Sequence, residues 1–288
     1  MEKTQRITDK EYFSYQGLSK SQLKQWNEGN PMMFWKKCVF NPNRVDEGIT
    51  DALVNGRLAH TLLLEPNKFD DEYIIIPDQR GFSSRKTQAF QKAIEENKTG
   101  KDLVLQSEFD SWIHRIKTLV SYDLVKSILK GIQIEKPIIW QEKGLTLKAK
   151  LDAVKNTPQG IVLIEYKTTS TIEKNVKGID LGGYVFDVGM QSKAIEALYG
   201  QTPTKMIFLI QSSKEDEENF IEIRSVEKQD IETCKIYTNL IIDKIKARLD
   251  KGLTDESFRT ELKERPFDGY QQTAFSLAFD KKFSDMEE

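Results

Sequence analysis

The hydrophobic pattern of the chain changes its period near residue 130, and this change constrains the fold more than any other feature of the sequence. Before it, apolar residues recur at the three- and four-residue spacing of amphipathic helices. After it, residues 132–140 and 145–154 alternate between apolar and polar side chains, as strands do. The elements that follow are ordered β-hairpin, helix, β-hairpin, helix. We therefore expect an α/β fold in which a central mixed β-sheet is flanked by helices, with a helical N-terminal layer.

The individual elements follow from caps, breakers and apolar stripes. Ser19 is expected to cap a helix that ends before Pro31, and a second helix is expected from Thr50 to Glu65, where Pro66 stops it. Further helices are predicted at residues 84–98, 107–130, 186–199 and 227–251, and further strands at residues 160–164, 205–211 and 220–226.

One domain accounts for the whole chain of 288 residues. Residues 1–130 form its mainly helical N-terminal part, residues 131–252 its α/β core and residues 253–288 a C-terminal tail. The tail is too rich in aromatic residues to be a free solvated segment, so we expect it to pack, for example in a contact between subunits. Its large apolar residues are Phe267, Tyr270, Phe275, Leu277, Phe279 and Phe283.

Composition excludes several classes of protein. The longest apolar runs span only about five residues, far fewer than a membrane-spanning helix needs. The first residues lack the apolar stretch of a secretory signal, so a cytoplasmic location is expected. Cys38 and Cys234 are too far apart in sequence to form a CxxC metal knuckle and are expected to be reduced. A net charge of −2 argues against a protein that coats nucleic acid, so any DNA binding must be local.

A carboxylate followed two residues later by lysine occurs at Glu96, Glu165, Glu261 and Asp280, so this spacing alone carries little information. Glu165 differs from the others because it ends the apolar run 161–164. Strand alternation places Glu165 and Lys167 on one side of a segment that is otherwise suited to burial. A charged pair in such a place requires a partner.

The preceding strand supplies that partner. If the chain turns at residues 158–159, positions whose numbers sum to 317 lie opposite each other, which pairs Asp152 with Glu165 at a β-carbon distance of about 5 Å. Two carboxylates this close repel each other unless a cation lies between them, and oxygen ligands favour Mg²⁺, with Mn²⁺ as a substitute. Lys167 then orients or deprotonates an attacking water. The same repulsion predicts that Asp152→Asn leaves the metal-free protein equally or more stable.

A plainer explanation of these residues stays open. Lys150, Asp152, Glu165 and Lys167 also suit a cross-strand salt-bridge ladder on a solvated sheet face, which is common and contributes little to stability.

The order of elements, with Asp152 before the hairpin and Glu165-Tyr166-Lys167 after it, resembles the PD-(D/E)xK nuclease superfamily. Within it, the chain is similar to the exonuclease VIII (RecE-type) nuclease domain of phages and prophages over roughly residues 14 to 250. The segments that carry this resemblance are Gly17–Ser21, Gly56–Pro66, Phe69–Tyr73, Lys148–Asp152 and Lys167–Thr169.

The resemblance implies roles for individual residues. His60 of the GxxxH motif is implied as a metal ligand, together with Asp152, Glu165 and the backbone carbonyl of Tyr166. Lys167 is implied as catalytic, and Gln191 and Tyr199 are implied to face the site from the following helix. The family usually has Asp where this chain has Glu165. Candidate DNA contacts are Arg57, Lys148, Lys150, Lys174 and Lys193. Lys20 is a further candidate, although taken alone it is better explained as a solvated charge.

The activity that the resemblance implies is that of a Mg²⁺-dependent double-stranded DNA exonuclease acting in the 5′ to 3′ direction. Such an enzyme resects DNA ends to single strands for recombination by annealing, works beside a RecT-type annealing protein and assembles as a homo-oligomer, here expected to be a tetrameric ring. Two alternatives remain: a catalytically degenerate DNA-binding or scaffold protein with the same fold, and an endonuclease of the same superfamily.

Overall fold

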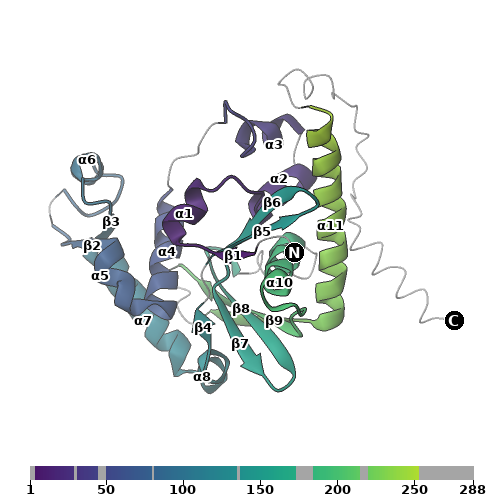
Figure 1. Cartoon of the computed structure of the whole chain (residues 1–288). Coiled ribbons are helices and arrows are strands. Elements are labelled where there is room, and N and C mark those ends of the chain that lie inside the picture. The colour runs from purple at the N-terminus through teal and green to yellow at the C-terminus, as the bar shows by residue number, and fades with distance from the viewer. Residues whose placement is uncertain are drawn as a thin grey trace, which may run out of the picture.

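The computed structural model describes residues 4–28, 31–44, 50–79, 81–134, 137–172, 184–214 and 220–252. The chain folds as expected into an α/β structure with a mixed central sheet and a helical N-terminal part (Figure 1). Lys174 and the predicted packing tail, residues 253–288, lie outside the described residues. In the described ranges, the structure contains no helix that combines the length and apolar character needed to cross a membrane.

Most of the helices precede residue 130, and most of the strands follow it. In chain order, the helices are α1 (Asp9–Ser14), α2 (Lys20–Glu28), α3 (Pro31–Lys37), α4 (Asp51–Leu64), α5 (Phe69–Glu72), α6 (Gln88–Glu96), α7 (Gln106–Ser121), α8 (Asp123–Leu129), α10 (Val185–Tyr199) and α11 (Lys228–Asp250). The strands are β1 (Gln5–Arg6), β2 (Tyr73–Ile76), β3 (Asp102–Leu105), β4 (Gln133–Ile134), β5 (Ile138–Glu142), β6 (Leu145–Ala149), β7 (Ala153–Thr157), β8 (Gly160–Thr169), β9 (Lys205–Ser212) and β10 (Ile221–Glu227).

The central sheet has five strands in the order β10-β9-β8-β7-β4. Its β8 and β9 strands run parallel, whereas the other neighbours are antiparallel, so the sheet is mixed. A smaller antiparallel sheet contains β1, β5 and β6, and β2 pairs with β3 in a parallel two-stranded sheet. The parallel pair of β8 and β9 requires a crossover, which α10 supplies between them.

The structure divides two segments that the sequence pattern presents as continuous. Residues 145–154 form β6 and β7, which belong to different sheets and are separated by a bend at Asp152. Their alternation continues across the bend, because Ala149, Leu151 and Ala153 are all buried, so periodicity alone does not reveal the change of sheet. Similarly, residues 107–130 form α7 and α8, which are separated at Tyr122.

Each face of the central sheet is covered by a different pair of helices, as Figure 1 shows. On one face, Tyr166 of β8 and Leu209 of β9 join a core cluster with Leu58 of α4 and Trp112 of α7. On the other face, the neighbouring residues of the same strands belong to the larger cluster with α10 and α11; they include Leu163, Phe208 and Ile210. This alternation sends adjacent residues of β8 to opposite sides.

The contact between α10 and α11 depends on a glycine. A β-carbon built on Gly189 would lie 1.9 Å from Thr238 Oγ1 and 2.8 Å from the carbonyl oxygen of Cys234. The second of these atoms belongs to the backbone, so it moves only if α11 itself moves. Gly189 therefore sets the distance at which α11 packs against α10.

We expect Gly189→Ala to lower the free energy of unfolding by about 2–3 kcal/mol, because the added methyl group overpacks a helix interface. Chemical denaturation of the purified variant measures this change. Gly56→Ala in α4 is the matched control, since a β-carbon there meets nothing closer than Thr168 Oγ1 at 3.6 Å. The control should be neutral or stabilising by up to about 1 kcal/mol through helix propensity. Equal effects of the two substitutions would contradict this account.

Candidate active site

The site lies beside the start of β7, where β8 continues past the end of their shared ladder. The ladder between these strands starts with Ala153 opposite Ile164, which is the register predicted for the hairpin and which brings Asp152 opposite Glu165. Asp152 lies in the bend before β7, so it forms no ladder bond. Its Oδ2 instead accepts a hydrogen bond of 2.7 Å from the backbone N–H of Tyr166. The carboxylate thus provides a hydrogen-bond acceptor for the backbone of β8 at a position where β7 no longer pairs with it.

The backbone carbonyl of Tyr166 faces the same edge. The carbonyls of Ile161 and Thr169 accept hydrogen bonds from Thr204 and Ser213, which continue from the two ends of β9. Because backbone groups alternate in direction along a strand, even-numbered residues of β8 point away from β9 and toward Asp152. The Tyr166 carbonyl therefore points toward Asp152, and its role as a metal ligand stays a prediction.

Glu165 is the most deeply buried carboxylate of the site, with 3% of its side chain exposed. Its Oε1 accepts hydrogen bonds from Lys20 Nζ at 3.0 Å and from Lys167 Nζ at 2.5 Å. Its Oε2 accepts a hydrogen bond of 2.6 Å from Gln191 Nε2. The structure therefore brings Glu165, Lys167 and Gln191 together, and it adds Lys20 from the N-terminal helix α2.

Asp187 also belongs to the site, and sequence reasoning missed it. Its Oδ1 accepts hydrogen bonds from Lys20 Nζ at 2.7 Å and Lys167 Nζ at 3.1 Å. It precedes Gln191 by four residues on α10, so the two side chains share a helix face. That spacing is the signal by which the sequence, with Gln191 already selected, could have identified Asp187.

His60 reaches the site from the other face of the sheet. It lies on α4, which begins after the N-cap Thr50 and packs on β8. Its Nδ1 is 3.4 Å from Asp152 Oδ1, and its ring centroid is 5.0 Å from that of Tyr166. The predicted meeting of His60 with Asp152 is thus present in the fold.

The charges of the site are mutually compensated. Burial raises the pKa of Asp152, but the neighbouring His60 imidazole, the positive charge of Lys167 and the Tyr166 N–H outweigh it and hold the pKa at about 2. Burial and the charge of Asp152 raise the pKa of Glu165, yet Lys167 and Lys20 lower it overall. The predicted repulsion between the two carboxylates is therefore present but is outweighed by nearby cations.

The two lysines are held as ammonium groups for the same reason. Burial lowers the pKa of Lys20, but the carboxylates of Glu165 and Asp187 raise it well above its ordinary value. Burial also lowers the pKa of Lys167, and the charge of Glu165 leads the contributions that raise it overall. A carboxylate left alone at this depth would be costly, so each side stabilises the charged form of the other.

The donor chemistry of the site suits a hard cation. The carboxylates of Asp152 and Glu165 and the Tyr166 carbonyl are the oxygen donors that would hold Mg²⁺, with His60 beside Asp152. Within the described ranges, however, no three His, Cys, Asp or Glu side chains are arranged so that they could hold a metal ion. Lys20 and Lys167 both bind one oxygen of each neighbouring carboxylate, Oε1 of Glu165 and Oδ1 of Asp187.

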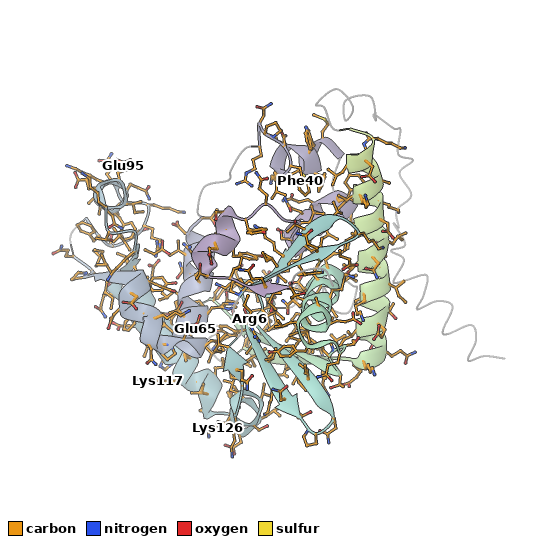
Figure 2. The ribbon with its side chains drawn as sticks, in the orientation of Figure 1. Arg6, Phe40, Glu65, Glu95, Lys117 and Lys126 are labelled. Atoms are coloured by element: carbon orange, nitrogen blue, oxygen red, sulfur yellow. The ribbon has the colours of Figure 1, made fainter. Side chains whose placement is uncertain are left out.

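Tyr199 is not brought to this cluster. It lies two turns beyond Gln191 at the end of α10, where its hydroxyl accepts a hydrogen bond of 2.6 Å from Arg6. Arg6 is labelled in Figure 2. A tyrosine that does lie near Lys167 is Tyr184, whose ring centroid is 5.9 Å from Lys167 Nζ. The spacing of eight residues keeps Gln191 and Tyr199 on one helix face but separates them by about 12 Å along the axis.

Two of the predicted DNA contacts are unsuited to that role. Lys148 is buried, and its Nζ donates to the carbonyl oxygens of Tyr12 and Tyr15, so it ties the segment around α1 to β6. Lys193 is buried as well, and its Nζ binds Glu142 and Asn239. Alternation and helix position did not reveal these partners, because they come from remote parts of the chain.

The other predicted DNA contacts differ in their surroundings. Arg57 forms an ion pair of 2.7 Å with Asp102 of β3, so its charge is partly compensated. Lys150 is exposed between β6 and β7, two residues before Asp152, which is the placement expected of a phosphate contact. Lys174 is among the residues outside the described ranges.

A buried polar chain fixes Tyr166 from behind. The Tyr166 hydroxyl donates to Gln211 Oε1 at 2.7 Å, and Gln211 Nε2 donates to the carbonyl oxygen of Arg115 at 2.8 Å. Tyr166 and Gln211 are both fully buried. The chain connects β8, β9 and α7 on the face opposite Glu165, so it restrains the strand segment whose backbone faces the site.

Comparison with known proteins identifies the fold. No model of a protein family matches the chain, and no curated protein matches it. Among solved structures, it is similar to a presumed exonuclease from Eubacterium rectale, with a TM-score of 0.53 and 15% sequence identity over 94% of this chain and 99% of that chain. A second structure, SSO0001, matches with a TM-score of 0.27 and 16% identity over 65% of this chain and 84% of that chain. The chain thus shares the overall fold of the first protein.

Tyr166→Phe should lower the free energy of unfolding by about 1–3 kcal/mol, because it leaves the buried Gln211 Oε1 without a donor. Urea denaturation measures the effect. Tyr237→Phe is the control: it removes a similar bond, to Asn27 at 2.6 Å, at a position that solvent partly reaches, so its effect should be smaller. A loss for Tyr166→Phe no larger than that of the control would contradict the role assigned to the buried chain.

Asp152→Asn should lower the stability of the metal-free protein at neutral pH by about 2 kcal/mol, the opposite of the expectation from repulsion alone. A carboxylate whose folded-state pKa is about 2 against a usual 3.8 stabilises the fold above pH 3.8, and this contribution is lost as the pH falls through 2. Denaturation of wild type and variant from pH 7 to pH 2 should therefore show a stability difference that shrinks in acid. A variant at least as stable as wild type at pH 7 would restore the repulsion argument.

Proposed function

We propose that the chain is a metal-dependent nuclease that hydrolyses phosphodiester bonds of double-stranded DNA from its ends. The observation that carries this proposal is the buried Glu165, bound to Lys167 and Gln191 beside Asp152 at the free edge of β8. Burying charged groups costs desolvation free energy, and clusters of buried charges with strongly shifted pKa values are typical of functional sites. The fold shared with a presumed exonuclease from Eubacterium rectale is compatible with this reading.

Different residues of the site would bind the metal ion and stabilise the transition state of hydrolysis. Mg²⁺, or Mn²⁺ in its place, would be held by Asp152, Glu165 and the Tyr166 carbonyl with His60 nearby, and when bound it supplies positive charge that polarises the phosphate. A water oxygen forms a bond to phosphorus while the bond from phosphorus to one sugar oxygen breaks. The water gives up a proton to solvent, and the departing oxygen takes one up. Lys167, as an ammonium group, donates a hydrogen bond to the charge that grows on the phosphate oxygens.

The finer assignment rests on the resemblance of the motifs to the RecE-type exonucleases. It adds the 5′ to 3′ direction, the production of single strands for annealing, a RecT-type partner and a tetrameric ring. A ring is consistent with the electrostatics of a chain with a net charge of −2, because it would concentrate lysine-bearing surfaces around the DNA.

A second function is favoured by one observation. The carboxylates of Glu165 and Asp187 are each bound by two lysines, as they would be in a protein that keeps the nuclease fold for binding or scaffolding and does not cut DNA. In that case the four charges would be a structural tie between α2, β8 and α10.

The deciding experiment compares linear and closed circular duplex DNA of the same sequence, incubated with the purified protein and Mg²⁺ or Mn²⁺. We expect degradation of the linear form and persistence of the circle. Lys167→Ala should reduce single-turnover cleavage at least about 100-fold while leaving the fold intact, because it removes a donor to the transition state.

Lys126→Ala is the control for removal of a lysine. Lys126 lies on α8 at the lower edge of Figure 2, where it pairs with Asp123. The Lys126→Ala variant should cleave linear DNA at the wild-type rate. Cutting of closed circles would identify an endonuclease, whereas a wild-type protein that binds DNA without cutting either form would favour the scaffold.

A further inference from the structure

Four charged side chains of the site form a closed arrangement, which we call the charge cluster: Lys20, Glu165, Lys167 and Asp187. Each of its two lysines donates to both carboxylates, and each carboxylate accepts from both lysines through one oxygen atom. The four Nζ to oxygen distances lie between 2.5 and 3.1 Å. Two positive and two negative charges balance, so the charge cluster is neutral as a unit.

Lys20 stands at the open side of the charge cluster. Its side chain is 33% exposed, against 20% for Lys167, 14% for Asp187 and 3% for Glu165. It is the first residue of α2, a helix that packs against α10 and α11. Of the four groups, its ammonium is therefore the one that an incoming molecule reaches most easily.

Both lysines retain capacity for another acceptor. An ammonium group has three N–H donors, and the hydrogen bonds of Lys20 and Lys167 within the charge cluster use two donors each. Because both ammonium groups contact the same two carboxylate oxygens, they lie close together and repel each other. An anion that accepts a hydrogen bond from each of them would relieve this repulsion, and a tetrahedral phosphate has oxygen atoms suitably spaced for that purpose.

We propose that Lys20 is a second catalytic lysine, which binds a non-bridging oxygen of the same DNA phosphate on which Lys167 acts, and that Asp187 is a positioning residue that orients both ammonium groups. This inference rests on the proposed nuclease function. It extends the site to the N-terminal helix, and it gives Asp187 a task that does not require contact with substrate.

Lys20 would stabilise the negative charge that develops on the phosphate during the reaction. The reacting phosphate gains negative charge as the bond to water forms, and two ammonium groups stabilise that charge better than one. Asp187 keeps Lys20 and Lys167 near each other in the absence of DNA, so less reorganisation is needed when the phosphate arrives. If the charge cluster were only structural, substitutions in it would lower the stability of the protein and leave the cleavage rate unchanged.

The test uses the full chain and the variants Lys20→Met and Lys20→Gln, with Lys24→Met as the matched control. Lys24 lies one turn further along α2 and is exposed, so its replacement removes the same charge from the same helix outside the charge cluster. Single-turnover cleavage of linear duplex DNA with Mg²⁺ at saturating protein gives the rate. Fluorescence anisotropy with Ca²⁺ in place of Mg²⁺ gives the affinity for DNA, and thermal melting reports the fold.

We expect Lys20→Met to reduce the single-turnover rate about 100-fold while the affinity for DNA falls less than about 10-fold, because the main contact is made in the transition state. Lys24→Met should remain within about twofold of wild type in rate. If the apolar Met side chain prevents folding, Lys20→Gln decides, since it keeps a hydrogen-bond donor and lacks the positive charge. It too should lose about 100-fold in rate.

Asp187→Asn tests the positioning role. It should reduce the single-turnover cleavage rate at saturating protein, while the protein concentration that gives the half-maximal rate stays unchanged. The conservative variant Asp187→Glu should recover part of the lost rate. A structural role alone would lower the melting temperature of Asp187→Asn with no change in the rate measured below that temperature.

Two outcomes separate this inference from the function on which it rests. A wild type that cuts DNA, together with a folded Lys20→Met or Lys20→Gln variant that cuts at the same rate, would overturn the role of Lys20 and leave the nuclease assignment intact. A wild type that cuts no DNA with either Mg²⁺ or Mn²⁺ would overturn both.

Discussion

The hydrogen bond from the Tyr166 N–H to the Asp152 carboxylate is the contact on which the arrangement of the site depends. It occurs because β7 begins only at Ala153, while β8 runs on to Thr169. The backbone of β8 beyond Ile164 therefore has a free edge, and a buried edge must find other partners. Asp152 supplies one, and in doing so it fixes the position of its carboxylate relative to Glu165.

The alternation of β8 then distributes the site between two layers of helices. Tyr166 turns toward α4 and α7, where His60 reaches the edge of the sheet and where Gln211 holds the phenol hydroxyl. Glu165 and Lys167 turn toward α10, where Asp187 and Gln191 bind them. A single strand thus brings together helices that contact its opposite faces, and the close packing of α11 behind α10 supports one of those layers.

Burial of charge is the remaining constraint. Glu165 is almost fully buried, and such a carboxylate stays ionised only if cations or hydrogen-bond donors offset its lost hydration. Lys20, Lys167 and Gln191 provide that compensation in the protein itself. A metal ion and a phosphate would have to engage the same groups, so catalysis in this site would involve an exchange of partners within a set of charges that is already balanced.

The sequence by itself determined the fold class, the hairpin register and the meeting of Asp152, Glu165 and Lys167, because strand alternation and turn position are local properties of the chain. It could not reveal that Lys20 joins them, that Lys193 is buried or that Tyr199 lies elsewhere. Those facts depend on how α2 and α10 dock against the sheets and on partners far away in the chain. Only the tertiary structure decides them, since the partner of a charged side chain is set by packing between elements and not by the pattern within one.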